Sequence, residues 1–297
     1  MSSTAWQLEP EWHQRITAAA QALRARGFDA EAASPAPVGL VLGSGLGGFV
    51  QAVDVRAEAS FGDVPGFAGG KVKAHAAKIL RGAVGGTEVL ILQGRPHAYE
   101  GLAAAEVVLP VAVMRELGCE VIVLTNAAGG LRRSMRAGEL AVLLDAIDLH
   151  QSDVARGILR PAAGINAELF GRASRPGALF DPELSQAIVR AARATGITLH
   201  REVYASVWGP HYEEPATIGW LRHIGAGVVG MSTGPEAAYL RAVGTRVVGL
   251  SCITNIAVQH GAVEVNHDEV VQVGGQSGGE FSRLLLAALP ALSGGSQ

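Results

Sequence analysis

Cysteine, net charge and long apolar runs are all scarce in this sequence. Only two cysteines occur, and Cys119 and Cys252 have neither metal-ligand spacing nor a C-x-x-C arrangement. We therefore expect both to be buried core thiols. The formal net charge of −3 offers no basic surface for a polyanion, which argues against nucleic-acid binding, although a local group of arginines can still hold a small anion.

The apolar runs, such as 38–42 and 120–125, are only as long as strands, so no membrane span is predicted. Residues 1–7 lack the basic and apolar regions of a signal peptide, and a cytosolic location is expected. Hydrophobic residues make up 48% and charged residues 17% of the 297, which is typical of an ordinary globular protein. The length suits one large α/β domain or two small ones.

Short apolar runs alternate with helical periodicity along the chain, which indicates an α/β fold. The predicted strands are 38–42, 88–93, 120–125, 140–147, 200–207, 226–230 and 246–251. The predicted helices are 10–26, 103–117, 182–195, 214–224, 235–243 and 268–289, with Thr233 as a candidate cap of the helix that contains Pro235. We find no repeat or interdomain linker, so residues 1–297 are expected to form a single domain. Residues 152–180, rich in Arg, Gly and Pro, are predicted to be an irregular insert with a role in function or in an interface.

Unusual polar residues directly follow several of the strand-like runs. They are Gly43-Ser44-Gly45, Gly94-Arg95-Pro96-His97, Thr125-Asn126-Ala127, Met231-Ser232-Thr233 and Thr254-Asn255. In open α/β sheets ligands bind outside the carboxyl ends of the strands. We therefore expect these five segments to meet at one pocket.

The turn Gly43–Gly48 follows a strand and lets backbone N–H groups approach an anion, with the Ser44 hydroxyl as a further donor. A phosphate role is favoured. The string also matches G-x-G-x-x-G, but a dinucleotide site would need an acidic residue about 20 positions on, after a second strand. Asp63 lies in a Gly-Pro turn instead. A dinucleotide site and a purely structural turn remain as alternatives.

Arg95 and His97 are two residues apart after an apolar strand, so an extended backbone would point both side chains to the same side. A planar guanidinium and an imidazole together suit a phosphate. Either residue alone would more simply be a surface arginine or a hydrogen-bonded histidine.

Seven sequence blocks stand out along the chain: Gly43–Gly48, Gln93–Gly101, Thr125–Gly130, Gly209–Glu213, Gly230–Thr233, Ser251–Asn255 and Asn266–His267. They occur in the order found in trimeric purine nucleoside phosphorylases, and the chain resembles that family across residues 38–268. The resemblance implies an α/β domain with a central mixed β-sheet flanked by helices. It also implies phosphate-dependent cleavage of inosine-like or guanosine-like nucleosides to a free base and (deoxy)ribose 1-phosphate, with phosphate as co-substrate and no cofactor or metal.

By the same resemblance, each part of the substrate has its own set of residues. Phosphate would be bound by Ser44, His75, Arg95, His97, the backbone N–H of Ala127, and Ser232; the ribose by Tyr99, Met231 and His267; the purine by Tyr212, Glu213 and Asn255. His97, Glu213 and Asn255 would carry the catalytic roles. Arg95 is assigned to the anion and not to the core, so Arg95→Ala is expected to weaken phosphate use and leave the fold intact.

Asn255 and Glu213 would select the base. Glu213 as a carboxylate accepts a purine ring N–H, and the Asn255 amide donates to a six-oxo group and accepts from a protonated imidazole nitrogen of the leaving base. A six-amino purine would set donor against donor at Asn255, and an unpaired buried polar group costs about 1–3 kcal/mol. The simpler interpretations are a solvated glutamate for Glu213 and a helix cap for Asn255.

Two regions differ from the family pattern. Residues 67–74 precede His75 where relatives have a Pro-Gly-His-Ala-Gly run, and the resemblance lapses from about 146 to Phe180. In the family the second region helps to form the trimer and lends an aromatic side chain to the neighbouring ribose site, for which Phe180 is the candidate here. The alternatives are a methylthioadenosine phosphorylase, a nucleotide-cofactor oxidoreductase and a non-catalytic nucleoside-binding protein.

Overall fold

The computed structural model describes residues 6–8, 10–29, 36–68, 76–150, 159–161, 178–257 and 267–293. The helices are α1 (Pro10–Arg24), α2 (Ala104–Glu116), α5 (Pro182–Thr195), α6 (Pro215–His223), α7 (Gly234–Ala242) and α8 (His267–Ser293). The strands are β1 (Trp6–Leu8), β2 (Val38–Leu42), β3 (Asp54–Ser60), β4 (Lys78–Val84), β5 (Thr87–Gln93), β6 (Val121–Gly130), β7 (Leu140–Asp148), β8 (Leu159–Pro161), β9 (Leu199–Ser206), β10 (Val228–Gly230) and β11 (Arg246–Ile256).

A mixed nine-stranded sheet has the order β10-β9-β7-β11-β6-β2-β5-β4-β3. Strands β2, β5, β6 and β11 run parallel to one another, whereas β7 is antiparallel to β11 and β4 to β5. A second pairing joins β10 to the end of β6, with Val228 opposite Gly130 and Val229 opposite Gly129. This pairing closes β6, β11, β7, β9 and β10 into a ring.

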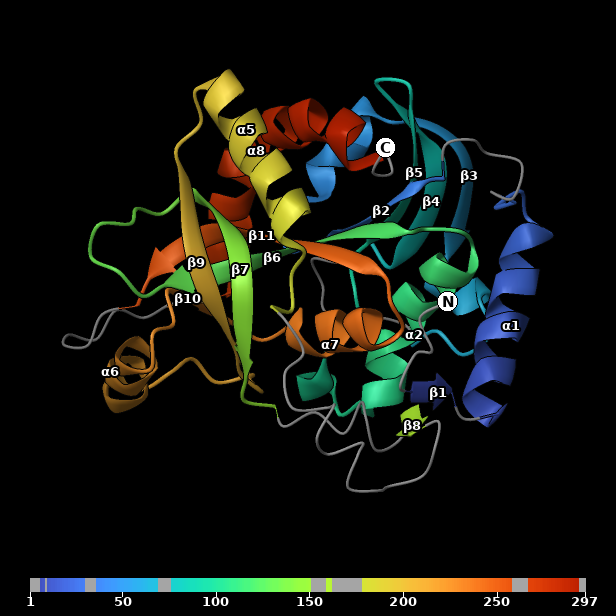
Figure 1. The fold of residues 1–297 in the computed structure, drawn as a ribbon, viewed down its shortest axis with the longest axis horizontal. Helices are drawn as coiled ribbons and strands as arrows, with labels where there is room; N and C mark the ends of the chain where they lie inside the picture. Colours follow the sequence, from blue (N-terminus) through green and yellow to red (C-terminus); the bar gives the residue numbers. More distant parts are fainter. Residues whose placement is uncertain are drawn as a thin grey trace.

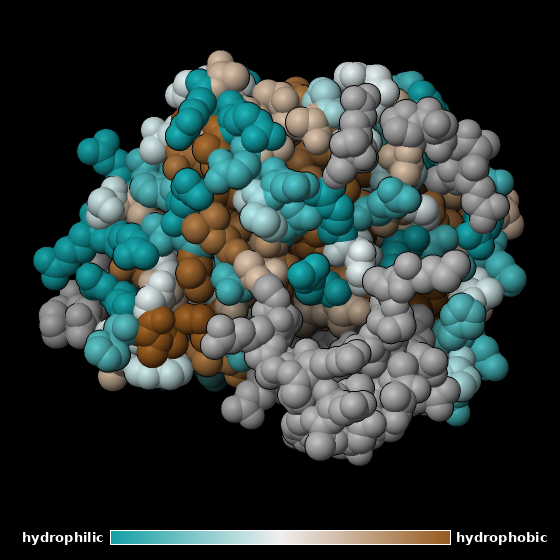
Figure 2. All heavy atoms as spheres, in the orientation of Figure 1, coloured by the Kyte–Doolittle hydropathy of each residue, from teal (hydrophilic) through white to brown (hydrophobic). Residues whose placement is uncertain are grey.

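Helices cover both faces of the sheet (Figure 1). On one face α1, α2 and α7 share a core with the sheet, and the Trp12 ring of α1 meets the Tyr239 ring of α7 edge-on at 6.2 Å. On the other face α5 and α8 bury Ile188 and Phe281 in a second core. Figure 2 shows mostly hydrophilic side chains over the described part of one molecular face, with hydrophobic residues showing between them. The predicted α/β class, with a central mixed sheet flanked by helices, is confirmed.

Helix α5 illustrates how local sequence sets an element. The Asp181 carboxylate accepts the backbone N–H groups of Glu183 at 2.9 Å and Leu184 at 3.1 Å, which satisfies two donors of the first turn. Gly196 ends the helix at φ +69°, a left-handed conformation that favours glycine. The predicted bounds of this helix and of strand β2 agree with the structure residue for residue.

The sequence did not predict strands β1, β3, β4 and β8. The last of these lies inside the insert that was predicted to be irregular, and it pairs antiparallel with β1, Gln7 opposite Arg160. Residues 162–177 of the insert lie outside the described residues, as do residues 69–74 of the other divergent region. Phe67, which begins that region, is buried against Phe61 with ring centroids 5.2 Å apart.

Both cysteines are buried, as predicted. Burial raises the pKa values of the Cys119 and Cys252 thiols, so both stay protonated at neutral pH. None of the helices in the described ranges combines the length and apolar character that a membrane span requires.

Candidate active site

One pocket gathers residues from all five of the segments that the sequence singled out. Its empty space is about 710 Å³, which includes the open solvent at its mouth. Its lining includes Ser44, Arg95, His97, Tyr99, Asn126, Ala127, Tyr212, Glu213, Met231, Ser232, Thr254 and Asn255. The prediction that the five segments converge is confirmed.

The route to this convergence differs from the prediction. The segments after β2, β5 and β10 are loops that follow the carboxyl ends of strands with a parallel neighbour. Asn126 and Asn255 lie within β6 and β11, because these two strands pair with each other beyond their predicted ends. Strand β10, which precedes Met231, pairs antiparallel with the end of β6. A bulge between Ile253 and Asn255 interrupts the β11 register, and bulges commonly re-aim a side chain beside an active site.

The turn that carries Ser44 is fixed against strand β6. The backbone N–H of Gly43 donates to Thr125 Oγ1 at 3.1 Å, and the same hydroxyl donates to the carbonyl of Val41 at 2.8 Å. A Cβ atom at Gly43 would lie 2.7 Å from the Cα of Asn126, so only glycine fits this approach. The close contact sets the position of Ser44 at the pocket wall.

Arg95 belongs to the buried framework as well as to the pocket wall. Its side chain is 1% exposed, and Nη1 donates to Glu236 Oε2 at 2.7 Å and to Thr233 Oγ1 at 3.2 Å. Nη2 donates to the carbonyl oxygens of Val41, at 3.3 Å, and Thr125. The expectation that Arg95 takes no part in the core is therefore wrong, whereas its contact with the anion stays a prediction. Removing Arg95 would leave Glu236, 2% exposed, as a buried carboxylate without its cation.

His97 is held by a carboxylate and an aromatic ring. Its Nδ1 lies 3.2 Å from Glu100 Oε1, which also accepts the backbone N–H of His97 at 2.8 Å. Its ring stacks on Tyr99 with centroids 4.7 Å apart. Burial lowers the pKa of His97, and the hydrogen bond to Glu100 only partly opposes this shift. A neutral ring that donates from Nδ1 to Glu100 presents Nε2 as an acceptor.

A network of hydroxyl and amide groups joins β6, β11 and the start of α7 behind the pocket. Asn126 Nδ2 donates to Thr233 Oγ1 at 2.9 Å, and Ser251 Oγ donates to Asn126 Oδ1 at 2.7 Å. Thr233 occupies the N-cap position of α7 at φ +65°, but its side chain makes no capping bond. The prediction that Thr233 caps this helix is correct in position and wrong in contact, because its hydroxyl bonds to Arg95 and Asn126.

The neighbouring Ser232 is fixed through its backbone. Its carbonyl oxygen accepts from the Tyr204 hydroxyl at 3.2 Å and the Ser206 hydroxyl at 3.1 Å, and its N–H donates to the Tyr204 oxygen at 3.3 Å. Tyr204 is completely buried, and burial raises its pKa to about 12. A neutral phenol therefore anchors the turn that presents the Ser232 hydroxyl to the pocket.

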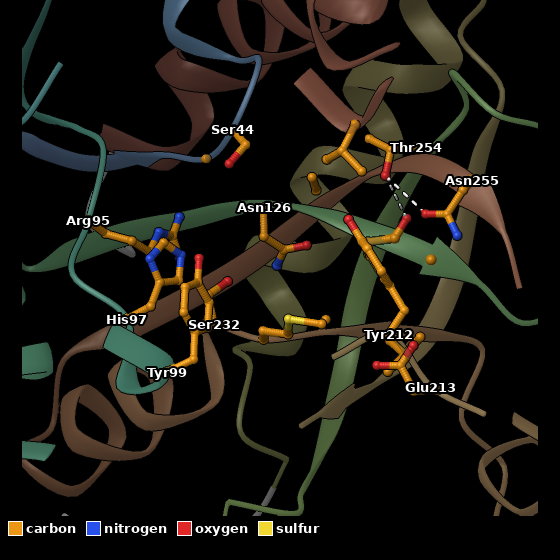
Figure 3. Close-up of a pocket in the computed structure, with 18 residues that line it drawn as sticks. Ser44, Arg95, His97, Tyr99, Asn126, Tyr212, Glu213, Ser232, Thr254 and Asn255 are labelled. Atoms are coloured by element: carbon orange, nitrogen blue, oxygen red, sulfur yellow. Dashed lines mark hydrogen bonds between the residues drawn. The ribbon is translucent and has the colours of Figure 1, made fainter. Parts of the chain in front are cut away.

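Figure 3 shows two groups of side chains at opposite ends of the pocket. Ser44, Arg95, His97, Tyr99 and Ser232 are at one end; Tyr212, Glu213, Thr254 and Asn255 are at the other. At the second end Thr254 Oγ1 lies 3.3 Å from Asn255 Oδ1, which helps to orient the amide.

The carboxyl of Glu213 is partly buried, and burial raises its pKa, with nearby Glu214 adding to the shift. Tyr212 beside it is 42% exposed. The glutamate therefore combines a desolvated carboxyl with an open approach from the pocket mouth.

Comparisons with known proteins agree with this geometry. The profile described as "Phosphorylase superfamily" matches residues 37–290. Purine nucleoside phosphorylase 1 of Bacillus subtilis is 36% identical over 84% of this chain and 90% of its own length, and the Bos taurus purine nucleoside phosphorylase is 34% identical over 85% and 89%. Among solved structures, the Schistosoma mansoni purine nucleoside phosphorylase is 30% identical to this chain. Its complex with inosine matches this fold with a TM-score of 0.78 over 92% of this chain and 94% of that one. Its complex with adenosine matches with a TM-score of 0.77 over 92% and 95%.

This chain belongs to the purine nucleoside phosphorylases. The family excludes the oxidoreductase alternative for Gly43–Gly48, and it agrees with the phosphorylase interpretation of the seven sequence blocks.

One residue expected from the purine nucleoside phosphorylase pattern is placed elsewhere. Phe180, the candidate to reach a neighbouring ribose site, is 1% exposed in the core of its own chain, against Leu143 and Gly249. That assignment is wrong, because the stretch before α5 turns into the core and not to the surface. His75 lies outside the described residues, as does the side chain of His267.

Sequence reasoning missed two residues that support this purine nucleoside phosphorylase pocket, Glu100 and Glu236. It expected Asn126 and Thr254 at the pocket within their segments but gave them no individual role. The spacing of Glu100, three residues after His97, was a usable signal. Glu236 carried none, because an acidic residue in the first turn of a helix is ordinary.

Proposed function

We propose that this chain uses inorganic phosphate to cleave 6-oxopurine (deoxy)ribonucleosides, such as inosine and guanosine, to a free base and (deoxy)ribose 1-phosphate. The observation that carries this proposal is a single pocket with hydroxyl, imidazole and guanidinium groups at one end and a carboxyl and an amide at the other. A phosphate at the first end and a purine at the second would have the sugar between them.

The phosphate would be held by the hydroxyls of Ser44 and Ser232, the side chains of Arg95 and His97, and the backbone N–H of Ala127. His75 would be a further ligand. Contact with Glu236 and Thr233 leaves the Arg95 guanidinium on the pocket wall, where it can face an anion. A protonated phosphate oxygen can donate to Nε2 of a neutral His97.

Tyr99 and Met231 would contact the ribose, and His267 its 5′-hydroxyl. Both Tyr99 and Met231 line the pocket. Burial raises the pKa of Tyr99 to about 12, so its hydroxyl stays protonated and can donate to a sugar oxygen at neutral pH.

The reaction breaks the bond between the anomeric carbon and the purine nitrogen, and the base leaves with the electron pair. A phosphate oxygen forms the new bond to the anomeric carbon, through an oxocarbenium-like sugar. Holding the two reactants in line can supply about 7–11 kcal/mol in ideal cases. Glu213 would accept a purine ring N–H, and Asn255 would stabilise the negative charge that develops on the base, with Tyr212 alongside.

Preference for a six-oxo base rests on Asn255, whose Nδ2 can donate to the oxo group. Because the Schistosoma mansoni relative has been solved with both inosine and adenosine, binding alone does not discriminate the bases. The preference has to be measured as a ratio of kcat/KM values. A methylthioadenosine phosphorylase would instead favour six-amino substrates.

We also propose a single domain over residues 1–297, a homotrimer and a cytosolic location. The shared core of α1, α2 and α7 supports the single domain, because the N-terminal helix packs on the same sheet as the rest. Sedimentation of the purified chain would test the trimer. The trimer has to form without Phe180, which is buried.

The test is release of hypoxanthine from inosine, assayed with and without inorganic phosphate, with ribose 1-phosphate measured in parallel. We expect release only with phosphate, and equal amounts of the two products. Release that does not depend on phosphate would indicate a hydrolase. Absence of release, with nucleoside binding retained, would indicate a non-catalytic binding protein.

A further inference from the structure

Glu236 lies behind Arg95, on the side away from the substrate pocket. Arg95 lines both the main pocket and a smaller cavity behind it, whereas Glu236 lines only the smaller cavity. The two side chains are 1% and 2% exposed, and Nη1 and Oε2 are 2.7 Å apart. The guanidinium therefore stands between the carboxylate and the place proposed for phosphate.

The hydrogen bonds of Arg95 fix its orientation before any ligand arrives. Nη1 donates to Glu236 and Thr233, and Nη2 to two backbone carbonyls. Among these acceptors only Glu236 carries a formal charge. A buried guanidinium without an anion is strongly disfavoured, so in the absence of phosphate Glu236 supplies the charge that keeps Arg95 in place.

A bound phosphate changes this balance, because two anions then face one guanidinium. The phosphate gains less binding free energy from an arginine that is already paired with a carboxylate than from one that is unpaired. The carboxylate also repels the phosphate across the guanidinium, in an interior where charges are poorly screened.

We propose that Glu236 is the resident counter-ion of Arg95: it positions the guanidinium in the absence of phosphate and limits the affinity of the pocket for phosphate. This rests on the proposed function, because the anion at Arg95 is taken to be phosphate. The sugar phosphate product carries the same group, so a limited affinity also favours its release. Glu236 is thus a positioning residue that touches neither substrate.

The test is Glu236→Gln, which keeps the shape and leaves an amide oxygen for Nη1 but removes the charge. In phosphate-free buffer we expect a lower Tm than wild type. By calorimetry we expect the Kd for inorganic phosphate to fall by roughly three- to tenfold, since one charge at close range in a partly buried site is worth about that much. Phosphate should accordingly raise the Tm of the variant more than that of wild type.

A matched control is Glu202→Gln. Glu202 is also buried, at 7% side-chain exposure, and pairs with Arg132 at 2.8 Å, but it does not line the pocket. We expect this variant to lose stability while its Kd for phosphate stays at the wild-type value.

The outcomes separate this inference from the proposed function. Wild-type protein that binds no phosphate overturns the proposed function, whatever the variants do. Wild type that binds phosphate while Glu236→Gln binds it equally or more weakly overturns the counter-ion role alone. If Glu236→Gln does not fold in phosphate-free buffer, added phosphate should restore folding, and failure to do so also overturns the role.

Discussion

Replacing Arg95 by alanine should destabilise the protein as well as weaken its use of phosphate. The substitution removes a guanidinium that is 1% exposed and leaves Glu236 without its cation. Breaking a buried ion pair from one side costs about 3–5 kcal/mol, because the remaining charge is uncompensated. Since a domain is typically stable by about 5–15 kcal/mol, that loss is a large share of the total.

The double variant Arg95→Ala/Glu236→Gln distinguishes an uncompensated charge from lost packing. Because the stranded carboxylate is replaced by a neutral amide, the double variant should recover much of the stability that Arg95→Ala loses. Arg56→Ala is the control, because Arg56 pairs with Glu88 on the surface at 48% side-chain exposure and should cost at most about 1 kcal/mol.

The assay is urea unfolding at pH 7 without phosphate, followed by tryptophan fluorescence, with all variants compared at equal protein concentration. A loss below about 1 kcal/mol for Arg95→Ala would refute the reasoning, because a pair this deeply buried should cost more. Strictly additive losses in the double variant would refute it as well, because the two side chains would then not be coupled.

Four further predictions concern the rest of the pocket and the core. Asn255→Asp should lower kcat/KM for inosine by about one to two decades and raise the adenosine-to-inosine ratio, and an unchanged ratio in a substrate profile would remove Asn255 from base selection. Glu213 has to be ionised to accept a hydrogen bond from the purine N–H, and burial raises its pKa. As the pH drops, kcat/KM for inosine should therefore begin to fall above the usual glutamate pKa of 4.5. Glu213→Gln should abolish this acidic limb of the pH profile. Gly43→Ala should raise the KM for phosphate and cost about 1–3 kcal/mol in urea unfolding, whereas Gly48→Ala, where an added Cβ meets nothing within 4 Å, should resemble wild type. Phe180→Ala should cost about 3–5 kcal/mol of stability, and a variant as stable as wild type would contradict its place in the core.

The elements that the sequence predicted best are those whose signals are local. Strand β2 is a continuous apolar run that is buried throughout, and α5 has Asp181 before Pro182 and a glycine after its last turn. Each signal acts within a few residues, so no knowledge of the tertiary structure was needed.

The strands that the sequence missed or shortened depend on their partners. Strand β3 is mostly exposed at the edge of the sheet, so its alternation of polar and small residues carries little apolar signal. Strand β6 extends through Asn-Ala-Ala-Gly-Gly, where β-propensity is low, because it pairs with β11 up to Ile256 opposite Gly130. Strand β11 extends through Cys-Ile-Thr-Asn-Ile along the same pairing.

The residues that meet at the pocket were predictable from the sequence, but their ion pairing and protonation were not. A glycine turn, an arginine and a histidine that directly follow two strands indicate an anion site. The turn offers backbone N–H groups, and the two side chains offer further polar groups at the ends of the strands. Whether that arginine is available to the anion depends on Glu236, 141 positions away, and whether the histidine is charged depends on burial that no local pattern reveals. With Arg95 paired and the pKa of His97 lowered, the described side chains at this end attract phosphate chiefly through hydrogen bonds and little through excess positive charge. Such a pocket recognises the shape and the donor pattern of phosphate, and its affinity is set by how much of the charge on Arg95 the carboxylate behind it already satisfies.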